Sequence, residues 1–112
     1  MSEERSFSEE RRGFRFLFPA KAEVFLENSA QAVAAHVTEL SLRGCFLTAK
    51  VPLGAQLLRV KIFSEGESVE APAEVIYTRA GGSGLVFGEM EPRSREVLQR
   101  WILAVLDHRV EQ

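Results

Sequence analysis

The 112-residue sequence predicts a mainly-β domain, in which six short antiparallel strands form a small barrel and a single helix follows at the C-terminus. Three observations support this prediction. Apolar and polar residues alternate in several short runs, and residues typical of turns separate these runs. After Pro92 the spacing of apolar residues changes to three and four, which is typical of an amphipathic helix. Short strands followed by one helix fit a barrel whose open end the helix covers.

The alternating runs define the strands. We expect strands over residues 20–26, 32–40, 44–48 and 57–63, a fifth up to about residue 78, and a sixth over 84–88. Pro19 marks the start of the first strand, and residues 27–29, 51–54, 64–67 and 81–83 supply the turns. Pro72 falls inside the fifth strand, and its missing N–H predicts an edge position or a bulge there.

The predicted helix covers residues 92–108, with Pro92 in the first turn, where proline is favoured. Its apolar residues recur on one face and are expected to be buried: Val97, Leu98, Trp101, Ile102, Val105 and Leu106.

Composition limits the class of protein. Apolar residues make up 46% and charged residues 27%, as in an ordinary single-domain globular chain. The net charge of −2 argues against nonspecific binding to polyanions. The single Cys45 cannot form an internal disulfide, so we expect a small buried hydrophobe in a reducing compartment. Without an apolar run of roughly 18 residues or a signal peptide, the expected location is cytoplasmic.

Catalysis is disfavoured, and we do not expect an enzyme. His36 and His108 are the two near-neutral bases, and neither has a nucleophile or a paired acid nearby in the sequence. Together with Cys45 they lack the spacing of a metal site, so neither a metal nor a cofactor is expected.

Two polar stretches stand out instead. Residues 1–10 are expected to be a mobile segment, and the domain to begin at residue 11 with Arg11, Arg12 and Arg15. Guanidinium groups can fork onto phosphate oxygens or onto the edge of a guanine. The second stretch, residues 39–44, places several hydrogen-bonding groups between two predicted strands. The plainer alternatives are a solvated basic patch and an ordinary turn.

The order of these stretches resembles the PilZ domain family. Residues 11–15 resemble its RxxxR motif, and residues 39–44 resemble its [D/N]xSxxG motif, with Ser41 and Gly44 in place. Residues 82–87 are similar to the family's final strand, which a helix follows. The resemblance extends over residues 10–106 and implies a six-stranded antiparallel barrel that binds the bacterial messenger cyclic di-GMP.

The resemblance also implies roles for single residues. Arg11 and Arg15 would contact phosphates and guanine edges, and Arg12 is a further candidate contact. Ser41 would hydrogen-bond the nucleotide, and Gly44 would let the backbone approach closely. Glu39 stands where the family has Asp or Asn, and either accepts from a guanine N–H or pairs with Arg43 or an N-terminal arginine.

The leading hypothesis is therefore a cyclic di-GMP receptor that passes its signal to a protein partner when its arginine loop, residues 11–15, becomes ordered. The alternative within the same family is an interaction adaptor that does not bind nucleotide. Binding of RNA or other single strands is disfavoured by the net charge and by the lack of an aromatic stripe.

Overall fold

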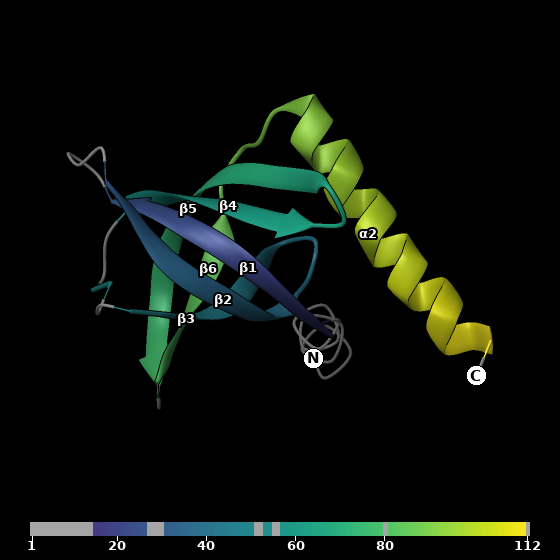
Figure 1. Ribbon diagram of the computed structural model, residues 1–112, viewed down its shortest axis with the longest axis horizontal. Helices are drawn as coiled ribbons and strands as arrows, with labels where there is room; N and C mark the ends of the chain where they lie inside the picture. Colours follow the sequence, from purple (N-terminus) through teal and green to yellow (C-terminus); the bar gives the residue numbers. More distant parts are fainter. Residues whose placement is uncertain (1–14, 27–30, 51–52, 55–56, 80, 112) are drawn as a thin grey trace, which may run out of the picture.

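The six predicted strands form a closed antiparallel barrel. The computed structural model describes residues 15–26, 31–50, 53–54, 57–79 and 81–111, the last four as backbone only. The strands are β1 (Phe16–Leu26), β2 (Ala32–Leu40), β3 (Gly44–Ala49), β4 (Leu57–Ser64), β5 (Glu67–Arg79) and β6 (Gly82–Phe87). They close in the order β1-β2-β3-β6-β5-β4 (Figure 1). The barrel and the terminal helix confirm the predicted fold class.

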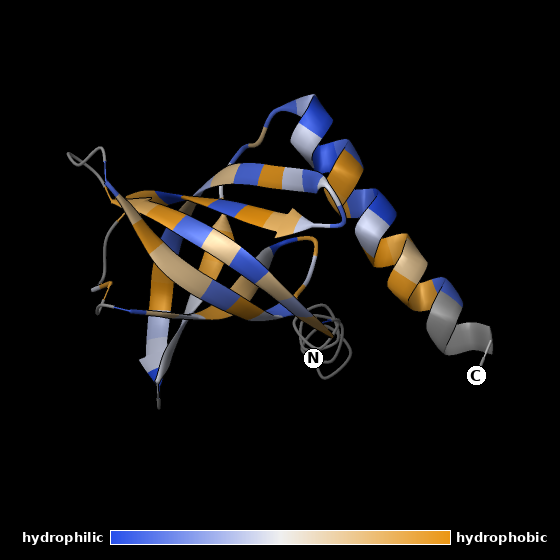
Figure 2. Ribbon diagram, in the orientation of Figure 1, coloured by the Kyte–Doolittle hydropathy of each residue, from blue (hydrophilic) through white to orange (hydrophobic). Residues whose placement is uncertain are grey.

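Burial follows the alternation on which the strand predictions rest. Hydrophilic and hydrophobic residues alternate along the strands in Figure 2, and most of the apolar ones are buried, with Leu17, Leu57 and Ile76 as exposed exceptions. Val24, Val37, Val60 and Ile62 are among the side chains that are fully buried. Burying one such side chain contributes about 1.5–3 kcal/mol, so this packing is a main source of stability for β1, β2 and β4.

The first strand begins earlier than predicted. β1 starts at Phe16, whereas proline chemistry predicted a start after Pro19. The pairing of β1 with β2 shifts register between Leu17 and Ala20. This irregularity takes Pro19, which has no N–H, into the strand without leaving a gap in a regular ladder.

The turn before β6 is also shorter than predicted. Gly82 and Ser83 belong to β6, and in the described part of this turn Gly81 has a left-handed backbone, with φ of 78°. Pro72 lies beside the end of β6, where its carbonyl accepts from the Gly88 N–H at 2.7 Å. Since N–H and C=O of one residue face the same side of a strand, the missing donor of Pro72 faces the edge of this pairing. The predicted edge position or bulge is nevertheless wrong, because β5 pairs with β4 on one side and β6 on the other, and Pro72 pairs in regular register with Arg59. The register shift in β5 lies further on, between Val75 and Tyr77.

The helix α2 (Pro92–Glu111) lies across one end of the barrel (Figure 1). Its Trp101 stacks on Phe18 of β1, with ring centroids 5.3 Å apart. Arg100 Nη1 donates to both carboxylate oxygens of Glu67, at the start of β5, at 2.9 Å each. These contacts fix the helix at the end of the barrel where β1 and β5 begin.

One predicted core residue of the helix is exposed. Leu106 keeps 39% of its surface accessible and Leu103 keeps 58%, whereas Leu98 is buried. The helix extends past the barrel, so its C-terminal half has less barrel surface to pack against (Figure 1). Within the described chain, no helix is long and apolar enough to cross a membrane.

Candidate functional site

The structure brings Arg15, Glu39 and the turn 41–44 to one end of the barrel. β1 and β2 are antiparallel, and Leu17 pairs with Glu39. Arg15, just before β1, therefore lies beside the last residues of β2. The predicted site residues that the structure describes are thus neighbours in space; Arg11 and Arg12 lie outside the described residues.

Arg15 is held by two partners. Its Nη1 donates to the Tyr77 hydroxyl at 2.9 Å and to Glu39 Oε1 at 3.3 Å. The hydrogen bond to Tyr77 is the main cause that raises the pKa of Arg15 above its usual value, and Glu39 adds to it. The guanidinium is therefore a fixed positive charge with a set direction.

Glu39 adopts one of the two arrangements expected for it. Its carboxylate pairs with an N-terminal arginine, Arg15, and each side chain keeps about a third or less of its surface accessible (27% and 33%). The methylene by which Glu exceeds Asp lets the carboxylate reach this far. In the described structure Glu39 is thus part of the positioning of Arg15.

Ser41 organises the turn between β2 and β3. Its Oγ accepts from the N–H groups of Arg43 and Gly44, both at 3.1 Å, and donates to the Gly44 carbonyl at 3.3 Å. The backbone N–H of Ser41 donates to the same carbonyl at 2.9 Å. Ser41 is buried, and its hydroxyl bonds the backbone of its own turn, as in an ordinary turn. These bonds set the shape of the turn.

Gly44 is required by a close approach of two strands. A Cβ at this position would lie 2.0 Å from the Leu85 carbonyl oxygen of β6. Gly44 is absent from the described residues with positive φ, so backbone angles do not explain the glycine. Any larger residue would push β3 and β6 apart directly beneath the turn.

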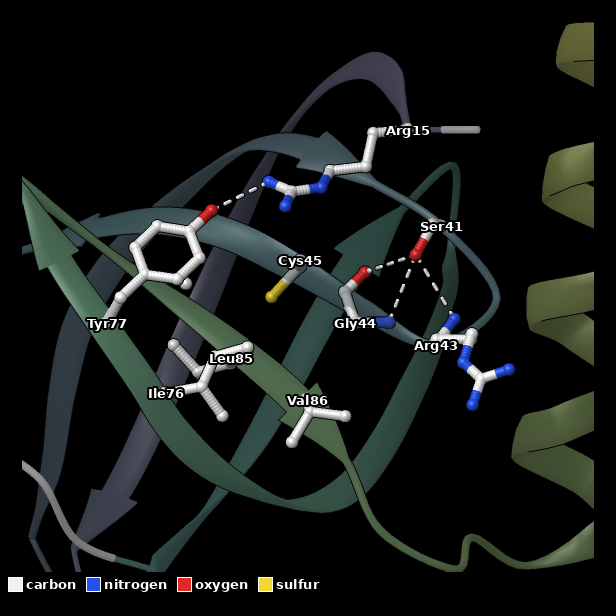
Figure 3. A pocket seen from close by; sticks show the side chains of 10 residues that line it. Arg15, Ser41, Arg43, Gly44, Cys45, Ile76, Tyr77, Leu85 and Val86 are labelled. Carbon is white, nitrogen blue, oxygen red and sulfur yellow. Dashed lines mark hydrogen bonds between the residues drawn. The ribbon is translucent and has the colours of Figure 1, made fainter. Parts of the chain in front are cut away.

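These residues enclose a small surface pocket of about 210 Å³. It is lined by Arg15, Ser41, Arg43, Gly44, Cys45, Ile76, Tyr77, Gly84, Leu85 and Val86 (Figure 3). Burial raises the pKa of the Cys45 thiol to about 12, although the Arg15 charge acts in the opposite direction. Cys45 is a neutral buried wall of the pocket, as the sequence predicted.

Sequence reasoning missed a patch of aromatic rings and cations that lies at the pocket. Phe46 and Tyr77 stack with centroids 6.2 Å apart and an interplanar angle of 26°. The guanidinium carbon of Arg79 lies 4.9 Å from the centre of the Phe46 ring and 5.6 Å from that of Tyr77. Arg15 lies 5.9 Å from the centre of the Tyr77 ring. Both rings are half-buried, so they form a local patch and not the exposed aromatic stripe that single-strand binding would use.

Two glycines of β6 make room for the rings. A Cβ on Gly84 would lie 2.4 Å from the Tyr77 ring, and one on Gly82 would lie 2.4 Å from the Phe46 ring. Gly84 pairs with Phe46 on one side and with Tyr77 on the other. The sequence contains these glycines as Gly-x-Gly in a predicted strand. Their role in making room for the two rings depends on the register of β3, β6 and β5, which the sequence does not show.

Comparison with known proteins identifies the family of the chain. The sequence profile of the PilZ domain matches residues 9–104, which is most of the chain. The chain belongs to the PilZ domain family. This family comprises cyclic di-GMP receptor domains, which bind ligands and act as adaptors. No curated protein sequence matches the chain.

The fold of this PilZ domain also resembles a solved structure. That structure is the PilZ domain of CeSA from a cellulose-synthesizing bacterium, with a TM-score of 0.64 and 16% sequence identity. The similarity covers 81% of this chain and 96% of the other. At this identity the likeness concerns the fold alone, and it confirms the barrel with its helix.

The pocket of this PilZ domain contains groups that can bind an anion or an aromatic base. Among the residues that the structure describes, no three His, Cys, Asp or Glu side chains gather as metal ligands. The pocket instead offers the Arg15 guanidinium, the backbone of the 41–44 turn and the half-buried Tyr77 ring. Cations attract phosphate, and aromatic faces stack on bases.

Proposed function

We propose that this PilZ domain binds cyclic di-GMP at the Arg15 pocket and passes the signal to a protein partner. The observation that carries the proposal is the convergence of Arg15 with Ser41 and Gly44, two motif residues that lie 24 or more positions further along the chain. Membership of the family supplies the ligand class. The messenger is a compact dianion with two guanine bases, which matches a fixed cation beside an aromatic ring.

The contacts of Arg15 are compatible with ligand binding. An exposed ion pair such as Arg15–Glu39 contributes about 0–1 kcal/mol, whereas a charge-assisted hydrogen bond to a phosphate contributes about 1.5–3 kcal/mol. A phosphate can therefore displace Glu39 from Arg15, or share Arg15 with Glu39, with a net gain in free energy. The Tyr77 hydroxyl, 2.9 Å from Nη1, keeps the guanidinium in place before the ligand arrives.

The assigned roles of the other residues rest on the resemblance. Arg11 and Arg12 would add phosphate or guanine contacts, and the segment 11–15 would become ordered over the nucleotide. Ordering of a segment opposes binding but turns it into a switch. Ser41 would bind the ligand at the expense of one of the three hydrogen bonds that its hydroxyl makes within the turn. A protein partner would read this change, because domains of this family act as binding and adaptor domains.

A second candidate is a PilZ adaptor that does not bind nucleotide. The Arg15–Glu39 ion pair favours it, because it satisfies the cation without a ligand. Under this hypothesis Glu39 replaces the phosphate as the partner of Arg15.

Titration calorimetry with cyclic di-GMP separates the two functions. We expect the wild type to bind, and Arg15→Ala to bind about ten to a hundred times more weakly, because one charge-assisted contact is lost. Arg59→Ala is the matched control, since Arg59 is an exposed arginine that pairs with Glu70 on the β4–β5 sheet. No binding by the wild type at roughly tens of micromolar nucleotide would refute the receptor hypothesis and leave the adaptor as the candidate. Equal affinity of wild type and Arg15→Ala would refute the role of Arg15.

A further inference from the structure

A second groove lies between the 41–44 turn and the helix. It has a volume of about 290 Å³ and lies apart from the Arg15–Tyr77 contact. Its lining residues come from the turn, the end of β6 and the first half of α2: Leu42, Arg43, Val86, Phe87, Gly88, Met90, Arg95, Leu98 and Gln99. No part of the proposed nucleotide chemistry uses Leu42, Met90 or Arg95.

The groove combines an apolar floor with positive charge. Leu98 and Met90 are buried in its wall, and Leu42 keeps 52% of its surface accessible although it is a large apolar residue. Arg43 and Arg95 are both exposed, and the described lining residues include no carboxylate. An occupant that matches this lining carries an apolar side chain next to a negative charge.

Arg43 lines both the Arg15 pocket and the groove, and its side chain is directed to the groove. In Figure 3 it extends away from Arg15 and Tyr77 and toward α2. Arg95, in the first turns of α2, lines the same groove from the other side. Its Nη2 lies 3.4 Å from the Met90 carbonyl, a long contact that leaves the rest of the guanidinium to solvent. The two arginines thus flank the apolar floor.

The groove is coupled to the nucleotide site by the turn itself. Leu42 and Arg43 lie between Ser41 and Gly44 in the chain, and the Ser41 hydroxyl accepts from the Arg43 N–H. The Arg43 carbonyl accepts in turn from the Phe87 N–H at 2.8 Å. A ligand that redirects the Ser41 hydroxyl therefore changes the position of two groove residues.

We propose that this groove binds a segment of a partner protein in which a large apolar side chain lies next to a carboxylate. The apolar side chain packs on Leu42, Met90 and Leu98, and the carboxylate pairs with Arg43 and Arg95. Its coupling to cyclic di-GMP rests on the proposed function; the docking itself does not. The groove is the surface through which the state of the 41–44 turn reaches the partner.

The probe is a displayed library of random 12-residue peptides, selected on the wild type. We expect enriched peptides to carry Asp or Glu within a few residues of Leu, Ile, Met or Phe. A synthetic representative should bind Arg95→Glu and Leu42→Ser about tenfold more weakly than the wild type. Arg93→Glu is the matched control, because it makes the same charge change on the same helix outside the groove. The free energy of unfolding of each variant in urea is measured and compared with that of the wild type, to show that each variant is folded.

The outcomes separate docking from coupling. Failure to enrich any peptide, enrichment of basic peptides, or equal binding by Arg95→Glu overturns the docking proposal. Because coupling is reciprocal, saturating cyclic di-GMP should change the peptide Kd by about fivefold or more. An unchanged Kd in a protein that binds both ligands overturns the coupling. Peptide binding without any nucleotide binding supports the groove and refutes only the proposed nucleotide function.

Discussion

Shortening Glu39 to Asp tests whether the carboxylate restrains Arg15 or itself binds the nucleotide. Removal of one methylene withdraws the carboxylate by about 1.5 Å. The 3.3 Å contact with Arg15 Nη1 then lengthens to roughly 4.5 Å, beyond the roughly 4 Å range of an ion pair. Arg15 keeps its hydrogen bond to Tyr77, so the guanidinium stays in place but loses its anionic partner.

The size of the effect follows from this geometry. The lost pair is partly exposed and contributes at most about 1 kcal/mol. A ligand phosphate no longer competes with it, so cyclic di-GMP should bind Glu39→Asp with equal affinity or up to about fivefold more tightly. Calorimetric titration measures this difference directly.

The matched control is Glu70→Asp. Glu70 also pairs with an arginine, Arg59, at 3.3 Å, but on a different part of the barrel. We expect no change in nucleotide affinity there. A loss of more than tenfold in Glu39→Asp would refute the reasoning and would mean that Glu39 contacts the nucleotide in its own geometry.

Three further predictions concern the barrel itself. Gly44→Ala places a Cβ against a backbone carbonyl that cannot turn aside, so urea unfolding should show a destabilisation of about 2 kcal/mol or more; unchanged stability would contradict the close packing of β3 and β6. Trp101→Ala removes a buried ring that stacks on Phe18 and should lower the free energy of unfolding by about 3–5 kcal/mol, as followed by circular dichroism. Cys45, buried with a pKa of about 12, should resist a thiol reagent at about pH 8 in the native protein and react fully in denaturant. Rapid labelling of the native protein would contradict the burial of Cys45. Because the pKa of Cys45 is raised on folding, its contribution to stability is complete below the unfolded pKa of about 8.5 and is lost as pH rises toward 12.

Local periodicity predicted most of the fold. The strand β4 illustrates this, since Leu58, Val60 and Ile62 alternate with charged residues and all three are buried. The errors fall where local pattern is silent. Pro19 looked like a strand boundary, but a register shift against β2 takes it into β1. Leu106 continues the apolar face of the helix, yet it lies where the barrel no longer reaches.

The candidate site was predictable only in part. Arg15, Glu39, Ser41 and Gly44 stand in recognisable order along the chain, and the structure places them together. The partnership of Arg15 with Tyr77 could not be predicted, since the two residues are 62 positions apart. It depends on the closure of the barrel and on the registers that bring β5 beside β6 and β6 beside β3.

Closure of the barrel limits how other molecules can join this domain. The described strands pair on both sides around the ring, so no long unpaired edge is offered. A partner cannot extend the sheet by adding a strand, a route that open sheets allow and that also leads to aggregation. Recognition must therefore depend on side chains and turns. A fusion or linker that alters the ends of the barrel is expected to disturb signalling more than one that alters its outer strand faces.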